Sequence, residues 1–255
     1  MKILCTDLDN TIIYSYKHDI GNDKRNVEIY QGREISFITN KTFELLQAVQ
    51  QEYLIIPTST RTIEQYNRIN LGIGEFKYAL TCNGGILLVD GKSNPDWYME
   101  SKQLIKDGIA DLNRAMNYLE NDERRKFELR FIEELFVFTK CNHPVDVINE
   151  LKGYLNSNLV DVFNNGEKVY VVPAALSKGM AVKRLRSYFP GDSITAAGDS
   201  EFDISMVEEA DKGIVPCGFK KTYNVSSIIS EMTDEKIFSE SMLEECLNKM
   251  AGQIL

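Results

Sequence analysis

The chain has 255 residues, and its 38 acidic side chains outnumber its 29 basic ones, which gives a formal net charge of −9. Proteins that bind nucleic acids through charge usually carry a basic surface, so this balance argues against a nucleic-acid partner. With 43% hydrophobic and 26% charged residues, the composition is that of a folded globular chain rather than a disordered one. No apolar run approaches the length of a membrane helix, so we expect no membrane span and a cytoplasmic protein.

The cysteines are Cys5, Cys82, Cys141, Cys217 and Cys246, and they form no CxxC or other metal-binding spacing. Their number is odd, which does not suit a disulfide framework, so we expect reduced and mostly buried thiols. The two histidines stand near no motif, and a histidine-based mechanism is not indicated.

Strand and helix patterns alternate in the first third of the chain, which is typical of an α/β fold. The expected elements are a strand at residues 2–6, a hairpin of residues 27–31 and 34–38, a helix from Thr39 or Asn40 to about residue 52, and a strand at 53–56. Pro57 stops the last of these apolar runs, as expected at the end of a buried parallel strand.

The pattern changes between about Gly84 and Pro173 and then returns to alternation. The middle part predicts a strand at 86–89, a helical stripe from Leu104 to Leu119, strands at 127–131 and 135–139, a helix at 144–155 and a hairpin closing on Asn164-Asn165-Gly166. Afterwards we expect a helix from Lys178, a strand at 194–197, a helix from Asp203, a strand at 213–215 and a helix near 238–250. The sequence therefore predicts an α/β core interrupted by an α+β insert.

Two carboxylates follow the first strand in the motif Asp7-Leu8-Asp9-Asn10-Thr11. Ligands of open α/β sheets gather outside the carboxyl ends of the strands, so both side chains are expected near a ligand. At this spacing one carboxylate can act as a nucleophile and metal ligand while the other transfers protons.

A second acidic cluster, Gly198-Asp199-Ser200-Glu201-Phe202-Asp203, follows the strand expected at 194–197. Carboxylates that converge from separate strand ends repel one another unless a cation lies among them, and a set of oxygen ligands favours Mg²⁺. Together the two motifs predict a magnesium site.

Two smaller signals complete a phosphate site. Thr58-Ser59-Thr60-Arg61 follows the strand at 53–56 and offers a hydroxyl group and backbone N–H groups to an anion, with Ser59 preferred over Thr58. Lys178 opens a helix directly after the insert, where its ammonium group would offset the charge of a carboxylate and a phosphoryl group.

In this order the four motifs resemble those of the haloacid dehalogenase-like phosphatase superfamily. An α+β insert between the second and third motifs is similar to subclass IIB, which includes sugar-phosphate phosphatases, sucrose-phosphate phosphatase and phosphomannomutase. The resemblance implies a Rossmann-like three-layer core with a parallel sheet, at 1–84 and 174–255, and an inserted α+β cap domain of type C2B at 85–173.

The resemblance also implies a role for each matching residue. Asp7 would attack phosphorus and form an aspartyl-phosphate, and Asp9 would protonate the leaving oxygen and later activate water. The Mg²⁺ ligands would be Asp7, the backbone carbonyl of Asp9, Asp199 and Asp203, the last directly or through water. Ser59 and Lys178 would hold the phosphoryl group.

Three positions extend or depart from the family pattern. Thr60 stands where many relatives have Gly, and Phe202 stands where many have Asn. Asn83, in the turn Asn83-Gly84-Gly85, would face the substrate or form a plain turn. In the insert, Arg130 and Lys168 are the candidate polar contacts to the leaving group.

Three function classes follow from these motifs. The leading one is Mg²⁺-dependent hydrolysis of a small phosphomonoester, with a sugar phosphate as the favoured substrate, by a monomer or weak dimer. The alternatives are a phosphomutase of the phosphomannomutase type, which would depend on a bisphosphate activator, and a non-enzymatic phospho-acceptor or regulatory protein. The presence of Asp9 and the large insert favour the phosphatase.

Overall fold

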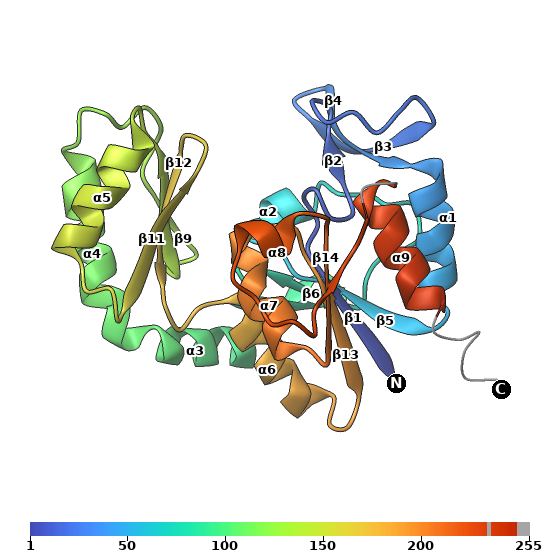
Figure 1. Ribbon diagram of the computed structural model, residues 1–255. Coiled ribbons are helices and arrows are strands. Elements are labelled where there is room, and N and C mark those ends of the chain that lie inside the picture. The colour runs from blue at the N-terminus through green and yellow to red at the C-terminus, as the bar shows by residue number, and fades with distance from the viewer. Residues whose placement is uncertain (234–235, 249–255) are drawn as a thin grey trace. The chain divides into compact units, whose positions relative to one another are not determined.

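The computed structural model describes residues 1–233 and 236–248, and the chain separates into two units (Figure 1). The first unit combines Met1–Ser93 with the chain from Lys178 onward, and the second is Asn94–Ser177. The domain boundaries expected from the sequence, and the assignment of the insert as a cap of type C2B, stay predictions.

A parallel sheet of five strands forms the centre of the first unit (Figure 1). Its order is β15 (Ser230–Glu231), β14 (Lys212–Val215), β13 (Ser193–Ala197), β1 (Lys2–Thr6) and β5 (Tyr53–Pro57). Each neighbouring pair runs parallel, which confirms the expected α/β core. The strands are short apolar runs because a sheet with helices on both faces is buried on both sides.

Helices cover the two faces of this sheet and make the first unit a three-layer structure. On one face α1 (Asn40–Val49) and α9 (Phe238–Asn248) pack together over a core that includes Leu4 and Ile55. On the other face lie α6 (Lys178–Tyr188) and α7 (Ile204–Glu209), which also pack together. Thr39 caps α1 by accepting a hydrogen bond from the backbone N–H of Thr42, as a polar residue at this position should.

Smaller elements complete the first unit. Two of them are antiparallel sheets, and the hairpin expected at 27–38 belongs to the first, where it is longer than predicted. These elements are β2 (Tyr14–Ser15), β3 (Lys24–Tyr30) and β4 (Arg33–Thr39); β6 (Tyr78–Thr81), β7 (Ile86–Val89) and β8 (Lys92–Ser93); and the short helices α2 (Ile63–Tyr66), η2 (Glu201–Asp203) and α8 (Phe219–Thr222). Along the sequence, the sheet β2-β4-β3 follows directly after the first motif.

The second unit is an α+β structure with its own hydrophobic core, as the sequence predicts for the insert. Its elements are α3 (Pro95–Leu104), η1 (Lys106–Gly108), α4 (Ile109–Glu120), β9 (Arg130–Ile132), β10 (Phe136–Lys140), α5 (Pro144–Tyr154), β11 (Val160–Asn165) and β12 (Lys168–Pro173). Helices α4 and α5 pack on one face of an antiparallel sheet of order β11-β12-β10-β9, through residues such as Leu112, Val137 and Leu151.

The prediction of one helical stripe from Leu104 to Leu119 is wrong, because this stretch does not form a single helix. Helix α3 ends at Leu104, and α4 begins after a 3₁₀ turn that ends at Gly108. A Cβ atom on Gly108 would lie 3.2 Å from the carbonyl oxygen of Leu159, so the 3₁₀ turn packs closely on the residue that precedes β11. The missed helix α3 has a start signal, since Asn94 accepts a hydrogen bond from the N–H of Trp97 and proline follows at the first position.

The strand expected at 127–131 begins only at Arg130. The carbonyl oxygens of Phe127 and Glu128 accept hydrogen bonds from the Thr139 hydroxyl group. At these two residues the Thr139 side chain thus takes the place of backbone pairing between strands. The C-terminal helix is described as far as Asn248, and Met250, which the sequence includes in it, lies outside the described residues.

None of the five cysteines forms a disulfide bond, and all but Cys217 are buried, as expected. Among residues 1–233 and 236–248, every helix is too short or too polar to cross a membrane.

The core of the second unit gives a direct stability prediction. Leu112 is fully buried on α4, so Leu112→Ala should lower the free energy of unfolding by about 2–5 kcal/mol through lost burial and a cavity. The control is Asn113→Ala on the exposed side of the same helix, which should change it by less than about 0.5 kcal/mol. Denaturant unfolding measures both, and equal effects would contradict the packing described for α4.

Candidate active site

Three loops meet because of the strand register in the parallel sheet. Thr6, the last residue of β1, lies opposite Ala197 on one side and Pro57 on the other. Asp7 continues the ladder by donating from its N–H to the carbonyl of Ala197 at 2.9 Å, and the N–H of Thr58 donates to the carbonyl of Thr6 at 2.8 Å. The first, second and fourth motifs therefore start side by side at one edge of the sheet.

Lys178 lies at the centre of this edge and binds two of the carboxylates. Its Nζ atom is 2.6 Å from Oδ1 of Asp7 and 2.5 Å from Oδ1 of Asp203. The Lys178 side chain is 1% exposed and that of Asp203 is fully buried, so both ion pairs are shielded from water. A buried pair of this kind becomes costly when one partner is removed, because the other charge stays buried and unpaired.

Gly179 allows the helix that carries Lys178 to approach α7. A Cβ atom at this position would lie 2.3 Å from the carbonyl oxygen of Ser205, which is closer than two such atoms can come. The N–H of Gly179 donates to the Ser205 hydroxyl group at 3.1 Å. The close approach of α6 and α7 brings Lys178 to Asp203.

The acidic loop of the fourth motif folds around the side chain of Asp203. Its Oδ2 atom accepts hydrogen bonds from the N–H of Asp199 at 3.1 Å, the N–H of Ser200 at 3.0 Å and the Ser200 hydroxyl at 2.8 Å. A Cβ atom on Gly198 would lie 2.3 Å from Cβ and Cγ of Asp203, so only glycine fits there. The hydroxyl of Thr11, in the first motif, donates to Oδ1 of Asp199 at 3.2 Å and links the two acidic motifs.

Burial and crowding change the proton affinity of these groups. Burial, with the neighbouring carboxylates of Asp203 and Asp199, raises the pKa of Asp7 well above its usual value, against the opposing effect of Lys178. Burial and the Asp203 charge raise the pKa of Asp199 to about 7. Burial alone would lower the pKa of Lys178, but the two carboxylates raise it, so the ammonium group stays charged.

The carboxylate oxygens of this site are the kind of ligand that a hard cation prefers. Asp7, Asp199 and Asp203 each offer a carboxylate oxygen, and these oxygens lie within 4.8 Å of one another. When all three carboxylates are ionised, the single ammonium of Lys178 leaves two negative charges uncompensated in a buried place. Oxygen ligands of this kind suit Mg²⁺ better than softer metals, so the residues fit the expected cofactor.

Ser59, in the second motif, lies next to Asn83. Both side chains belong to buried residues, and the N–H of Asn83 donates to the carbonyl of Ser59 at 3.0 Å. Asn83 has φ of 59°, in the left-handed region where Asn is more tolerated than most residues. The Thr58 hydroxyl donates back to the carbonyl of Ile56 at 3.1 Å, whereas the Ser59 oxygen accepts from the N–H of Arg61 at 3.2 Å.

Asp9 faces a residue that the sequence analysis did not single out. Its side chain is half exposed, and both its oxygens accept hydrogen bonds from Arg61, at 2.8 Å from Nε and 2.7 Å from Nη2. Arg61 also binds Glu28, a buried residue of β3. The position of Arg61 directly after the second motif was a signal for this contact, but nothing in the pattern of β3 identified Glu28.

The candidate polar contacts of the insert lie on one face of its sheet. Arg130 is opposite Phe138, which is opposite Tyr170, and Lys168 precedes Tyr170 by two residues. Because side chains alternate along a strand, Arg130 and Lys168 share the face that is not packed on α4 and α5.

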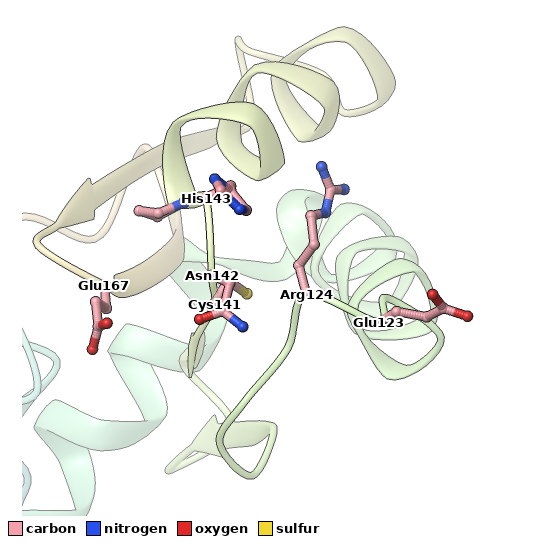
Figure 2. Close-up of a pocket in the computed structure, with 7 residues that line it drawn as sticks. Glu123, Arg124, Cys141, Asn142, His143 and Glu167 are labelled. Carbon is pink, nitrogen blue, oxygen red and sulfur yellow. The ribbon is translucent and has the colours of Figure 1, made fainter.

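An open pocket lies in the second unit, and none of the predicted site residues lines it. Figure 2 shows its side chains, with the carboxylates of Glu123 and Glu167 on opposite sides. Arg124 in this pocket is bound by Asp122 at 2.7 Å and Glu150 at 2.9 Å. The pocket does not bring its charged groups to one point as the acidic site does.

The family model of the haloacid dehalogenase-like hydrolases matches residues 86–215, which is half of the chain. The chain belongs to the haloacid dehalogenase-like hydrolases. This confirms the family indicated by the four motifs, including the likeness to subclass IIB. No match is found among the curated proteins.

Solved structures share the fold over nearly the full chain. The sucrose-phosphatase of Synechocystis sp. PCC6803, solved with sucrose and phosphate, has a TM-score of 0.65 at 16% identity and covers 97% of both chains. A haloacid dehalogenase-like hydrolase from B. subtilis has a TM-score of 0.59 at 14% identity, covering 97% of this chain and 99% of its own. A trehalose-6-phosphate phosphatase related protein has a TM-score of 0.56 at 14% identity and covers 99% of both chains.

The raised pKa of Asp199 predicts a pH-dependent stability difference in this hydrolase when metal is removed with EDTA. The pKa is about 7 in the folded protein and about 3.9 in an unfolded chain, so ionisation costs stability as pH rises between these values. Asp199→Asn removes this cost. The variant should therefore be more stable than wild type above about pH 7, and the difference should shrink towards about pH 4.

Thermal unfolding at a series of pH values measures this difference. The exposed Asp19→Asn, whose carbonyl oxygen keeps the turn hydrogen bond to Gly21, is the matched control and should show no such trend. A stability difference between Asp199→Asn and wild type that is flat across this range would show that Asp199 is not electrostatically strained.

Proposed function

We propose that this hydrolase is a Mg²⁺-dependent phosphatase that hydrolyses a small phosphomonoester, a sugar phosphate, through an aspartyl-phosphate. The observation that carries the proposal is the buried cluster in which Lys178 binds Asp7 and Asp203 beside Asp199. A phosphoryl transfer site needs a nucleophile and cations that offset the charge of the transferred group. This cluster supplies the nucleophile, one cation and the ligands for another.

Asp7 is the proposed nucleophile. Its side chain is only 8% exposed, and Lys178 binds one of its oxygens while the other stays available for attack. In the first step an Asp7 oxygen forms a bond to phosphorus as the bond to the leaving oxygen breaks. The ammonium group of Lys178 balances part of the negative charge that gathers on Asp7 and the phosphoryl group.

Asp9 is the proposed proton donor and acceptor. It lies two residues from Asp7, and its half-exposed side chain has access to both a leaving group and water. In the first step Asp9 gives a proton to the leaving oxygen. In the second step it takes a proton from the water that attacks phosphorus, which releases inorganic phosphate and restores the Asp7 carboxylate.

The residues that would hold Mg²⁺ are Asp7, Asp199 and the backbone carbonyl of Asp9. Asp203 already accepts hydrogen bonds on both oxygens from Lys178, Asp199 and Ser200, which favours its proposed contact through water. A bound Mg²⁺ would supply positive charge that offsets the phosphoryl oxygens and favours the ionised form of Asp7.

Ser59 and Asn83 are the proposed polar contacts to the substrate. The preference for Ser59 over Thr58 is supported because the Thr58 hydroxyl is already used by the carbonyl of Ile56. A sugar phosphate is favoured as the substrate class because the fold is that of the sucrose-phosphatase, whose structure contains sucrose and phosphate. We infer that the second unit selects the leaving group, with Arg130 and Lys168 on the open face of its sheet as the candidate contacts.

The test is release of inorganic phosphate from a panel of sugar phosphates, nucleotides and p-nitrophenyl phosphate. Wild-type protein should turn over at least one member with Mg²⁺, and EDTA should abolish the reaction until Mg²⁺ is restored. Asp7→Asn should lower the rate at least about a thousandfold, because an amide is not a nucleophile for phosphorus.

Asp19→Asn makes the same chemical change on the surface of the first unit and should keep full activity. If folded Asp7→Asn retains turnover, Asp7 is not the nucleophile. If folded, Mg²⁺-loaded wild type releases phosphate from no member of the panel, the phosphatase proposal is wrong.

A further inference from the structure

The guanidinium group of Arg61 joins two carboxylates that come from distant parts of the chain. Its Nε and Nη2 atoms donate to Asp9, Nη1 and Nη2 donate to Glu28 at 2.9 and 3.0 Å, and Nη1 also donates to the carbonyl of Gln65 at 3.3 Å. An arginine has five N–H donors, so each donor of Arg61 has an acceptor in this arrangement. Arg61 thus serves as a bridge between Glu28 and Asp9.

The two ends of this bridge differ in burial. The Glu28 side chain is fully buried and that of Arg61 is 13% exposed, whereas the Asp9 side chain is 50% exposed. Water screens the outer ion pair and weakens it, so Asp9 can leave Arg61 to exchange a proton. The inner pair is shielded from water and holds the guanidinium in place.

Glu28 is fixed by more than Arg61. Its Oε2 atom accepts from the Ser36 hydroxyl at 2.6 Å, and its Oε1 atom accepts from Nε of Arg68 at 3.1 Å. Burial alone would raise the pKa of Glu28, but the hydrogen bonds from Arg61 and Ser36 outweigh it and keep the pKa below the usual value. Glu28 therefore stays a carboxylate in the interior of the first unit.

The backbone around Glu28 explains why an acidic side chain points inward. The pairing of β3 with β4 shifts register on both sides of Glu28, which marks a β-bulge. A bulge redirects a side chain, and bulges are common next to active sites. The N–H of Asn70 donates to the carbonyl of Val27 at 2.8 Å, which ties β3 to the segment that follows Arg61 and α2.

We propose that Glu28 is a positioning residue for Asp9: its buried carboxylate fixes the guanidinium group of Arg61, and Arg61 holds the side chain of Asp9 beside Asp7. The inference rests on the proposed role of Asp9 as proton donor and acceptor. The sheet β2-β4-β3, which follows the first motif, thereby contributes to catalysis without touching the substrate. When residue 28 is neutral, Arg61 loses the ion pair that fixes its position, and the full positive charge of its guanidinium group acts on Asp9. Both changes hinder proton transfer by Asp9.

The kinetic test compares two leaving groups in Glu28→Gln. The leaving group of p-nitrophenyl phosphate needs no proton, whereas that of a sugar phosphate does, so only the latter depends on Asp9 in the step that kcat/KM reports. We expect kcat/KM for the most active sugar phosphate to fall about ten- to a hundredfold, and that for p-nitrophenyl phosphate to fall less than about threefold. A structural defect would lower both equally, and that result or no loss would overturn the inference.

Three further variants control this comparison. Glu34→Gln makes the same change at an exposed position of β4 and should leave both rates unchanged. Asp9→Asn should give the same selective loss, and adding Glu28→Gln to it should lower the rate little further if the two residues act together. If Glu28→Gln fails to fold, Ser36→Ala removes one donor from Glu28 and should give a smaller loss with the same selectivity.

A measurement without turnover separates this inference from the phosphatase proposal. In protein with ¹⁵N-labelled arginine, the Arg61 Nε–H signal, assigned by its loss in Arg61→Lys, should exchange with water at least about ten times faster in Glu28→Gln. An unchanged exchange rate would overturn the inference even if the protein is a phosphatase. If wild type turns over no phosphate ester but exchange becomes faster, the positioning of Arg61 by Glu28 holds and the phosphatase proposal alone is wrong.

Discussion

The ion pairs of Lys178 with Asp7 and Asp203 are the interaction on which the site depends. An ammonium group that is 1% exposed requires nearby negative charge, and closely spaced buried carboxylates require nearby positive charge. Each partner comes from a different segment: the end of β1, the start of α6 and the loop after β13. The electrostatic balance therefore holds these three segments in one arrangement and still leaves net negative charge for a cation.

Two glycines make this arrangement sterically possible. Gly179 lets α6 approach the backbone at Ser205, and Gly198 lets the Asp203 side chain fold back over its own loop. The folded loop then uses Oδ2 of Asp203 to satisfy two backbone N–H groups and the hydroxyl of Ser200. Close backbone packing and ligand orientation are thus parts of one structural requirement, which explains why glycine stands directly beside the charged residues.

The sheet β2-β4-β3 adds a second polar network beside the first. In the buried cluster a lysine lies between carboxylates, and in the outer network Arg61 lies between Glu28 and Asp9. The outer network opens to water at Asp9, where a proton would enter and leave in the proposed reaction, while the inner cluster is closed. A gradient from buried to exposed charge across the site fits a reaction that needs a fixed nucleophile and a mobile proton carrier.

The sequence by itself determined the core strands, the insert and the acidic motifs, because apolar runs followed by Asp or Gly are local patterns. It also indicated Lys178, at the start of a helix, and Ser59, in the loop after a strand, because both positions can be read from the order of elements along the chain. Only the tertiary structure decided that Arg61 bridges Asp9 to Glu28. Regular alternation along β3 would put Glu28 on the opposite face from Val27, but a bulge turns both inward, and a bulge depends on the pairing strand rather than on local sequence. The break between α3 and α4 also lies where Gly108 packs closely on Leu159, a contact between residues far apart in the chain.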